Sequence, residues 1–250
     1  MGIVIKSSRE IATMRQAGRI AAEVFGILVA RLKPDMKTKE LNEIAEEELA
    51  RREAKPSFKG YHGFPASICV SVNDEIVHGI PGERVLKEGD VVSLDLGTIF
   101  GGFQGDCAVT TGVGNVSPEA ARLIEATRGA LEAGVAATRP GARLGDISAS
   151  IEQFAKGAGY EVVREYTGHG IGREMHEGPQ VPNYGRAGSG ILLRAGMTLA
   201  LEPMLTSGTW RTRVDDDRWT VRTADGGLSA HFEHTVAITE EGPEVLTVAG

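Results

Sequence analysis

Four acidic residues interrupt segments of the chain that are otherwise apolar. Asp95 follows Val-Val-Ser-Leu, and Asp106 lies beyond the next Gly-Gly pair in the sequence. Glu202 follows Thr-Leu-Ala-Leu, and Glu233 lies within His-Phe-Glu-His-Thr-Val-Ala-Ile. A lone acid of this kind is usually exposed or paired with arginine. Four buried together would raise their own pKa values or unfold the site unless cations neutralised them. Since bridging carboxylates hold pairs of divalent ions in hydrolases, the set predicts a metal site.

Three histidines lie in glycine-rich stretches and extend this pattern. His169 and His176 stand seven residues apart in TGHGIGREMHEGP, and His78 precedes Gly-Ile-Pro. A lone histidine in a loop is more often a solvated surface group. Here, flanking glycines let the backbone approach a site closely. Imidazole and carboxylate ligands without thiolate suit zinc, manganese, cobalt or iron, and the sequence does not choose among them.

The other three histidines are predicted to differ in their distance from the site. His62 and His234 are interpreted as lying outside the site. Side chains alternate along a strand, so His234 should point away from the face that carries Glu233, whereas His231 should share that face.

The elements that would position these residues begin with an amphipathic helix. Ser7 and Glu10 form a capping box, and apolar residues recur at helical spacing from Ile11 to Leu32, before Pro34. The pattern next predicts a helix from near Thr38, strands over 67–72 and 91–100, a turn at Gly101-Gly102, a return strand over 103–111, and a helix capped by Ser117 and Pro118.

The order of elements then repeats. The segment around Pro34 is echoed around Pro140, and the strand ending at Asp95 is echoed by the one ending at Glu202, with offsets that agree to within one residue. Asp106 corresponds to Glu233, with a longer loop in the second hairpin. We expect one catalytic domain over residues 1–250, in which two α+β halves share a core, because neither half shows a linker.

The composition of the chain excludes several classes of protein. With 250 residues, 41% of them hydrophobic, the chain is long enough for a substantial core. The apolar stretch Ile20–Leu32 is broken by Glu23 and Arg31, and the N-terminus lacks a signal-peptide pattern, so we expect no membrane span and no export. Two cysteines without CxxC spacing fit a reducing cytoplasm, and a net charge of −7 disfavours a nucleic-acid groove.

The motifs VNDEIVHGIP, SLDLG, GDCAVTTGVG, GHGIGREMHEGPQVPNYG, LALEPM and SAHFEHTVAIT resemble, in order and spacing, the signatures of type I methionine aminopeptidases. The resemblance runs from about residue 10 to the end of the chain. It implies the α+β "pita-bread" fold, in which two pseudosymmetric halves form an antiparallel sheet covered by helices. It also implies removal of the initiator methionine from nascent proteins whose second residue is small.

The resemblance also implies roles for individual residues. The metal ligands of the family fall on Asp95, Asp106, His169, Glu202 and Glu233, with Asp106 and Glu233 bridging two divalent ions. Glu202 would manage the proton of the attacking water, and His176 would polarise the carbonyl oxygen. His78 and His176 would contact the substrate near the scissile bond. A methionine pocket would be formed by Tyr61, Phe64, Cys69, Tyr166, Met175 and Trp219.

Three positions depart from the family pattern. Met175 stands where many relatives carry phenylalanine, His231 stands where they usually carry glutamine, and Val77 replaces a common cysteine. The expected partners are nascent polypeptides, reached at the ribosome, and the expected state is a monomer in the cytoplasm.

Three alternative classes of protein would differ from this sequence in specific features. A proline-specific aminopeptidase or prolidase would share the five ligands but usually adds an N-terminal domain, for which the first helix leaves no room. The type II form would need a large insertion between Glu202 and Glu233. A non-catalytic binding protein on the same fold would lack the metal ligands.

Overall fold

The computed structural model describes residues 2–250. Its helices are α1 (Ser8–Arg31), α2 (Thr38–Arg51), α3 (Pro118–Ala137), α4 (Leu144–Gly157) and the 3₁₀ turn Tyr61–Gly63. Its strands are β1 (Lys55–Pro56), β2 (Cys69–Val72), β3 (Glu75–Val77), β4 (Val91–Phe100), β5 (Phe103–Gly112), β6 (Glu161–Val162), β7 (Gly168–Gly170), β8 (Glu177–Val181), β9 (Thr198–Leu201), β10 (Met204–Thr206), β11 (Thr212–Val214), β12 (Val221–Thr223), β13 (Ser229–His231), β14 (Glu233–Thr239) and β15 (Gly242–Val245).

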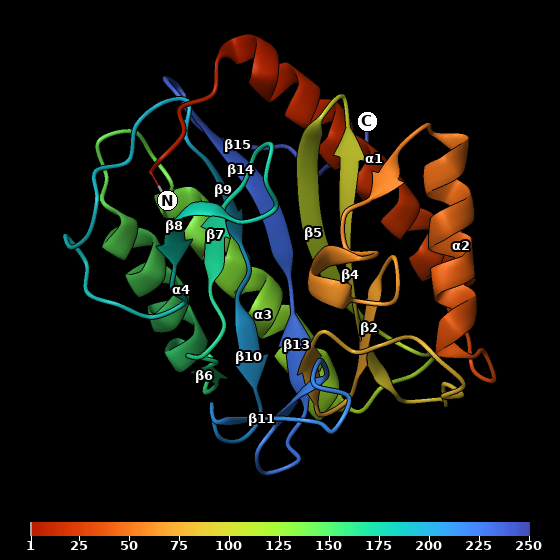
Figure 1. Ribbon diagram of the computed structural model, residues 1–250. Helices are drawn as coiled ribbons and strands as arrows, with labels where there is room; N and C mark the ends of the chain where they lie inside the picture. Colours follow the sequence, from red (N-terminus) through yellow and green to blue (C-terminus); the bar gives the residue numbers. More distant parts are fainter. Residues whose placement is uncertain (1) are drawn as a thin grey trace.

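A curled sheet forms the centre of the molecule (Figure 1). Its strand order is β1-β4-β5-β14-β9-β7-β8, with β2 also paired to β4 and β15 to β14. The β4–β5 hairpin of the first half therefore lies directly beside the β14–β9 pair of the second. Two smaller sheets, β13-β10-β6 and β11-β12-β3, are built largely from the segment between β9 and β14.

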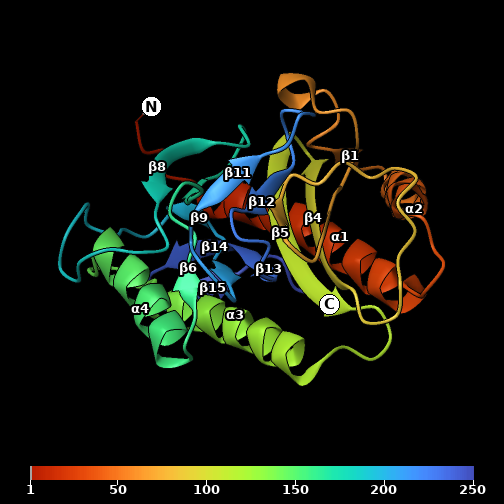
Figure 2. The same ribbon diagram turned by 90° about the horizontal axis from the view of Figure 1, so that it is seen from below.

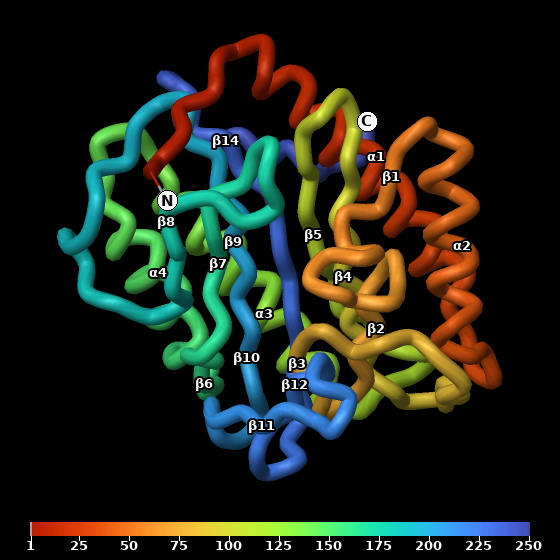
Figure 3. Tube along the Cα trace, viewed as in Figure 1, coloured from red at the N-terminus to blue at the C-terminus, as the bar shows by residue number. Residues whose placement is uncertain are grey.

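Each half of the sheet is covered by its own pair of helices, as the view from below shows (Figure 2). Helices α1 and α2 pack with β2 and β4 around Leu28, Leu41 and Leu94. Helices α3 and α4 pack with β9 and β14 around Leu123 and Ile147. The trace in Figure 3 follows the same succession of helix, helix and hairpin twice along the chain.

Strand β4 shows how the sequence separates core from site. Leu94 and Leu96 are fully buried in the core beneath α1 and α2. Asp95 lies between them and lines a cavity on the opposite face, as the alternation of side chains along a strand requires.

Several sequence-based predictions of elements are confirmed. The Ser7 hydroxyl accepts a hydrogen bond from the Glu10 amide, and the Glu10 carboxylate accepts one from the Ser7 amide at 3.0 Å. Ser117 caps α3, with Pro118 at its first turn. Bridges Lys37–Val85 and Arg143–Leu192 occupy equivalent places before α2 and α4 and support the internal repeat.

Within residues 2–250, the helices are all too short or too polar to cross a bilayer. The assignment of one domain to residues 1–250 stays a prediction.

Candidate metal centre

Three of the acidic residues meet on neighbouring strands at the middle of the sheet. In the β4–β5 register, Asp95 is opposite Ala108 and Gly97 is opposite Asp106, so the two aspartates are diagonal neighbours. On the other side of β5, Glu233 of β14 is also opposite Ala108. This arrangement confirms the predicted cross-strand proximity of Asp95 and Asp106.

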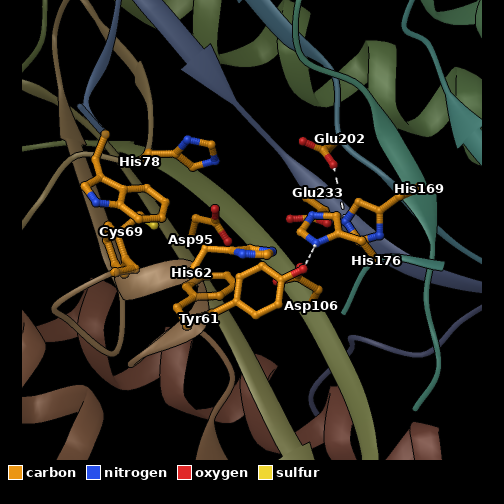
Figure 4. A pocket seen from close by; sticks show the side chains of 13 residues that line it. Tyr61, His62, Cys69, His78, Asp95, Asp106, His169, His176, Glu202 and Glu233 are labelled. Atoms are coloured by element: carbon orange, nitrogen blue, oxygen red, sulfur yellow. Dashed lines mark hydrogen bonds and ion pairs between the residues drawn. The ribbon is translucent and has the colours of Figure 1, made fainter. Parts of the chain in front are cut away.

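The remaining two predicted ligands approach from the second half (Figure 4). His169 on β7 is opposite Ala200 of β9, and Glu202 follows β9 directly. His169 Nε2 lies 3.6 Å from Glu202 Oε1. Potential ligand atoms of Asp106, His169 and Glu233 all lie within 4.8 Å of one another.

Glycines on either side of His169 permit this approach. A Cβ atom on Gly168 would lie 2.3 Å from the Ala200 carbonyl oxygen, and one on Gly170 would lie 2.2 Å from the Gly178 carbonyl oxygen. Any other residue at either position would push β7 away from its neighbours, so these glycines allow close packing between strands. The predicted approach of the backbone to the site itself stays a prediction.

Burial makes the acidic cluster costly in the absence of a cation. Burial raises the pKa of Asp95 well above its ordinary value, with a further contribution from Asp106. Burial also raises the pKa of Asp106 to about 7. The pKa values of Glu202 and Glu233 are raised well above normal by burial and then by the neighbouring acids.

The donor atoms fit a divalent metal. Asp95 Oδ1, Asp106 Oδ1 and Glu233 Oε1 are buried and have no hydrogen-bond partner among the described residues. Such oxygens are rarely left unsatisfied in a folded protein. Burial lowers the pKa of His169 to about 4, which leaves a neutral imidazole able to donate an electron pair. Hard oxygen donors with one imidazole nitrogen form a suitable divalent-metal site.

A cavity of about 250 Å³ opens over this cluster. It is lined by all five predicted ligands, by His78 and His176, and by Phe58, Tyr61, His62, Phe64, Cys69 and Trp219. Its lining thus combines carboxylates and imidazoles with aromatic side chains.

The two outer histidines face the cluster from different elements (Figure 4). The ring of His176 lies 4.2 Å from that of His169, between centroids. His78 follows β3, has a left-handed backbone (φ 60°) and lies edge-on to Tyr166 and Trp219. A strained backbone of this kind at a non-glycine residue is often found at functional sites.

The loop that carries His176 is held in place by contacts of the next residue, Glu177. Glu177 forms an ion pair with Lys6, and the two side chains are only 7% and 3% exposed. The second oxygen of the Glu177 carboxylate accepts a hydrogen bond from the Arg173 amide at 2.9 Å. The N-terminal segment therefore helps to hold His176 over the metal centre.

The predicted methionine pocket is only partly reproduced by the cavity lining. Tyr61, Phe64, Cys69 and Trp219 line the cavity, whereas Tyr166 and Met175 lie outside the lining within the described part of the chain. Tyr166 packs behind His78, and Met175 is buried against Phe103 and Ile171. A substrate-binding role for these two residues stays a prediction.

Sequence reasoning missed two residues of the cavity. His62 lines the cavity mouth although it is exposed, and Phe58 contributes to the wall. The signal for His62 was its place beside Tyr61 between two glycines, a setting that favours a tight turn.

The predicted alternation of side chains around Glu233 is confirmed. His234 points away from Glu233 and bonds to the Thr247 hydroxyl at 2.8 Å. His231 is buried, and its Nε2 lies 4.0 Å from Glu202 Oε2. The departure from glutamine at position 231 therefore places an imidazole beside a predicted ligand.

Comparisons with known proteins assign the chain to a family. The signature of "Metallopeptidase family M24" matches residues 12–240. A methionine aminopeptidase of Clostridium acetobutylicum is 51% identical, over 98% of this chain and 99% of that protein. The crystal structure of methionine aminopeptidase from Thermotoga maritima superposes with a TM-score of 0.97 at 45% identity, over 99% of this chain and 100% of that one.

The class defined by fold and site is thus a metallopeptidase with the pita-bread fold. The chain belongs to family M24 and, within it, to the methionine aminopeptidases. The predicted fold, enzyme class and dependence on divalent metal ions are confirmed. A prolidase from Pyrococcus furiosus shares the fold at a TM-score of 0.81 but only 22% identity, with 66% of its length covered.

Proposed function

We propose that this protein removes the N-terminal methionine from newly made polypeptides whose second residue is small. The observation that carries the proposal is one cavity in which the carboxylate–imidazole cluster adjoins an aromatic pocket. Its volume of about 250 Å³ is below the roughly 300–1,000 Å³ of pockets for drug-sized ligands. Such a cavity suits a single side chain rather than a long stretch of peptide.

Two divalent ions would be held by Asp95, Asp106, His169, Glu202 and Glu233, with Asp106 and Glu233 as bridging ligands. When bound, such ions act as Lewis acids and lower the pKa of water. The donor set is compatible with cobalt, manganese, iron or zinc.

The surrounding side chains would carry out the remaining steps. His176 would donate a hydrogen bond to the carbonyl oxygen of the first residue as negative charge develops there. Glu202 would accept the proton of the attacking water, since its carboxylate lines the cavity beside the other predicted ligands, 3.6 Å from His169 Nε2. His78 would contact the substrate from the opposite wall.

The thioether side chain would lie against Phe64, Cys69 and Trp219. Phe64 and Trp219 meet edge to face with their centroids 5.1 Å apart, and Phe64 is buried. Aromatic and sulfur-bearing walls make favourable contacts with a polarisable methionine side chain. Tyr166 and Met175 would support this wall from behind.

We place the reaction in the cytoplasm, on nascent chains at the ribosome, because initiator methionines first become exposed there. A monomer would suffice, since every residue of the cavity comes from one chain.

The test is an assay of metal-stripped protein, resupplied with single divalent ions, on Met-Gly-Met, Met-Leu-Met and Xaa-Pro peptides. The proposal requires release of methionine from Met-Gly-Met, much slower release from Met-Leu-Met, and dependence on added metal. Preferential cleavage of Xaa-Pro peptides would instead establish a prolidase-type activity.

A further inference from the structure

The hydroxyl of Tyr61 is hydrogen-bonded to one ring nitrogen of His176. The Tyr61 Oη to His176 Nδ1 distance is 2.7 Å, and the two rings lie nearly parallel, at 29°, with their centroids 5.5 Å apart. Figure 4 shows this contact as a dashed line, with His176 between Tyr61 and His169. Tyr61 therefore touches the catalytic apparatus as well as lining the cavity.

The backbone around Tyr61 is arranged to hold this phenol in place. Tyr61 begins a 3₁₀ turn between Gly60 (φ 85°) and Gly63 (φ 89°), and His62 is itself left-handed (φ 48°). The Tyr61 carbonyl accepts a hydrogen bond from the Phe64 amide at 2.9 Å. Of these three positive-φ positions only His62 is not a glycine, and a left-handed non-glycine residue persists only where the surroundings fix it.

Packing fixes the ring of Tyr61 as well. It lies against a buried cluster that includes Met14, Phe103 and Met175. Burial raises the pKa of the Tyr61 hydroxyl, so the phenol keeps its proton at neutral pH. The group facing His176 is thus a fixed hydroxyl rather than a phenolate.

The direction of this hydrogen bond decides which His176 nitrogen carries the proton. A neutral imidazole has one N–H donor and one acceptor nitrogen, and the bond made by one nitrogen sets the state of the other. A phenol hydroxyl is a stronger donor than a neutral imidazole N–H and a weaker acceptor than its bare nitrogen. The favoured arrangement is therefore donation from Tyr61 Oη to Nδ1, with the ring proton on Nε2.

We propose that Tyr61 is a positioning residue of the reaction, whose hydroxyl holds His176 in the tautomer with its proton on Nε2. The proposal rests on the proposed function, in which His176 donates to the carbonyl oxygen of the first residue. Within residues 2–250, the bond from Tyr61 to Nδ1 is the only hydrogen bond found for the His176 ring, so an N–H at Nε2 is available to be that donor.

The alternative tautomer would oppose the reaction. It would present the Nε2 lone pair to an oxygen that gains negative charge, and the resulting repulsion would replace a stabilising hydrogen bond. A donor held in the correct orientation before the reaction needs no reorganisation as the charge develops. The Tyr61 hydroxyl would thus act on turnover through His176, while its ring contributes to the wall.

The test uses Tyr61→Phe, which removes only the hydroxyl and leaves the ring in the wall. The matched control is Tyr160→Phe, the same deletion at a tyrosine packed against the α3–α4 core. Histidine-selective ¹⁵N labelling of protein loaded with Zn²⁺ reports the protonated nitrogen of His176, and a His176→Gln spectrum assigns its signals. Turnover is measured in parallel with Met-Gly-Met.

The proposal predicts protonated Nε2 and bare Nδ1 in the wild type and in Tyr160→Phe. In Tyr61→Phe the signals should shift toward a mixture of tautomers, kcat should fall by roughly 10- to 100-fold, and KM should change much less. An Nδ1–H tautomer in the wild type, or an unchanged tautomer or kcat in Tyr61→Phe, would overturn it. Wild-type protein that keeps the Nε2–H tautomer but releases no methionine would instead count against the proposed function.

Discussion

Individual polar atoms reveal the site before any substrate is considered. Each of Asp95, Asp106 and Glu233 leaves a carboxylate oxygen buried without a partner in the described chain, although buried polar groups are normally satisfied. The fold tolerates this arrangement because cations would complete it. Removal of the cations should therefore affect the fold itself as well as the reaction.

His176 provides a prediction at the residue scale. His176→Ala should retain the metal content of the wild type, because His176 is absent from the predicted ligand set. Its kcat should fall by roughly 10²-fold or more, as expected for loss of a group that acts mainly in the transition state. Metal analysis together with steady-state kinetics checks this, and unchanged turnover would remove His176 from the mechanism.

The β11–β12 hairpin is the element that carries Trp219 into the cavity. It is joined to β3, which leads into His78, by the guanidinium of Arg222. This group contacts Asp74 at 2.7 Å, Glu75 at 2.6 Å and Asp215 at 2.5 Å. Because Glu75 is largely buried, these ion pairs are less screened by solvent than those elsewhere on the surface.

Arg222→Met should loosen this hairpin and leave the negative charge of Glu75 with only one arginine partner, Arg84. We expect KM for methionine peptides to rise by roughly 10-fold, because part of the pocket wall would no longer be held in place. Metal content should stay unchanged. Arg15→Met, which breaks the exposed Arg15–Glu244 pair, is the control and should leave KM as in the wild type. Equal KM values in the two variants would show that Arg222 does not fix the wall.

At the scale of the whole molecule, the internal repeat of helix, helix and hairpin could be predicted from the sequence because its elements have strong local sequence signals. The helices have caps and apolar periodicity, and the hairpins carry an acid at matching places. The small sheets β13-β10-β6 and β11-β12-β3 could not be predicted in this way, since most of their strands have only three residues and pair across distant segments.

The site residues could likewise be predicted where the local sequence signal was strong, but contacts between distant segments could not. The five predicted ligands were visible as acids and an imidazole in unusual surroundings, and the resemblance assigned their expected roles. The contact of Tyr61 with His176 was not visible, because it joins a turn in the first half to a loop in the second. Likewise, only the folded chain shows that Met175 lies behind the cavity wall.

The metal centre also predicts how stability depends on pH. Above about pH 7.5, the buried histidines are largely neutral in the unfolded chain, where their ordinary pKa is about 6.5. They are neutral in the folded chain as well, because burial lowers the pKa values of His78 and His169 to about 4. Burial raises the pKa of Asp106 to about 7 and those of Asp95, Glu202 and Glu233 well above normal. The metal-free folded chain then binds more protons than the unfolded chain, so its stability should fall as the pH rises.

Thermal unfolding with a chelator and with Mn²⁺ or Zn²⁺ checks this dependence. The Tm of the metal-free protein should decrease from about pH 7.5 to about pH 8.5, and the gain in Tm on adding metal should increase over the same range. A metal-free Tm that rises with pH would show that other groups dominate the balance.

The central claim is that these carboxylates hold the metal on which methionine removal depends. The most direct measurement is of bound metal per chain and of methionine release from Met-Gly-Met on the same preparations of wild type and Asp106→Asn. We expect Asp106→Asn, folded as judged by circular dichroism, to lose at least one metal equivalent relative to the wild type together with nearly all activity. Wild-type metal content and turnover in Asp106→Asn would contradict it.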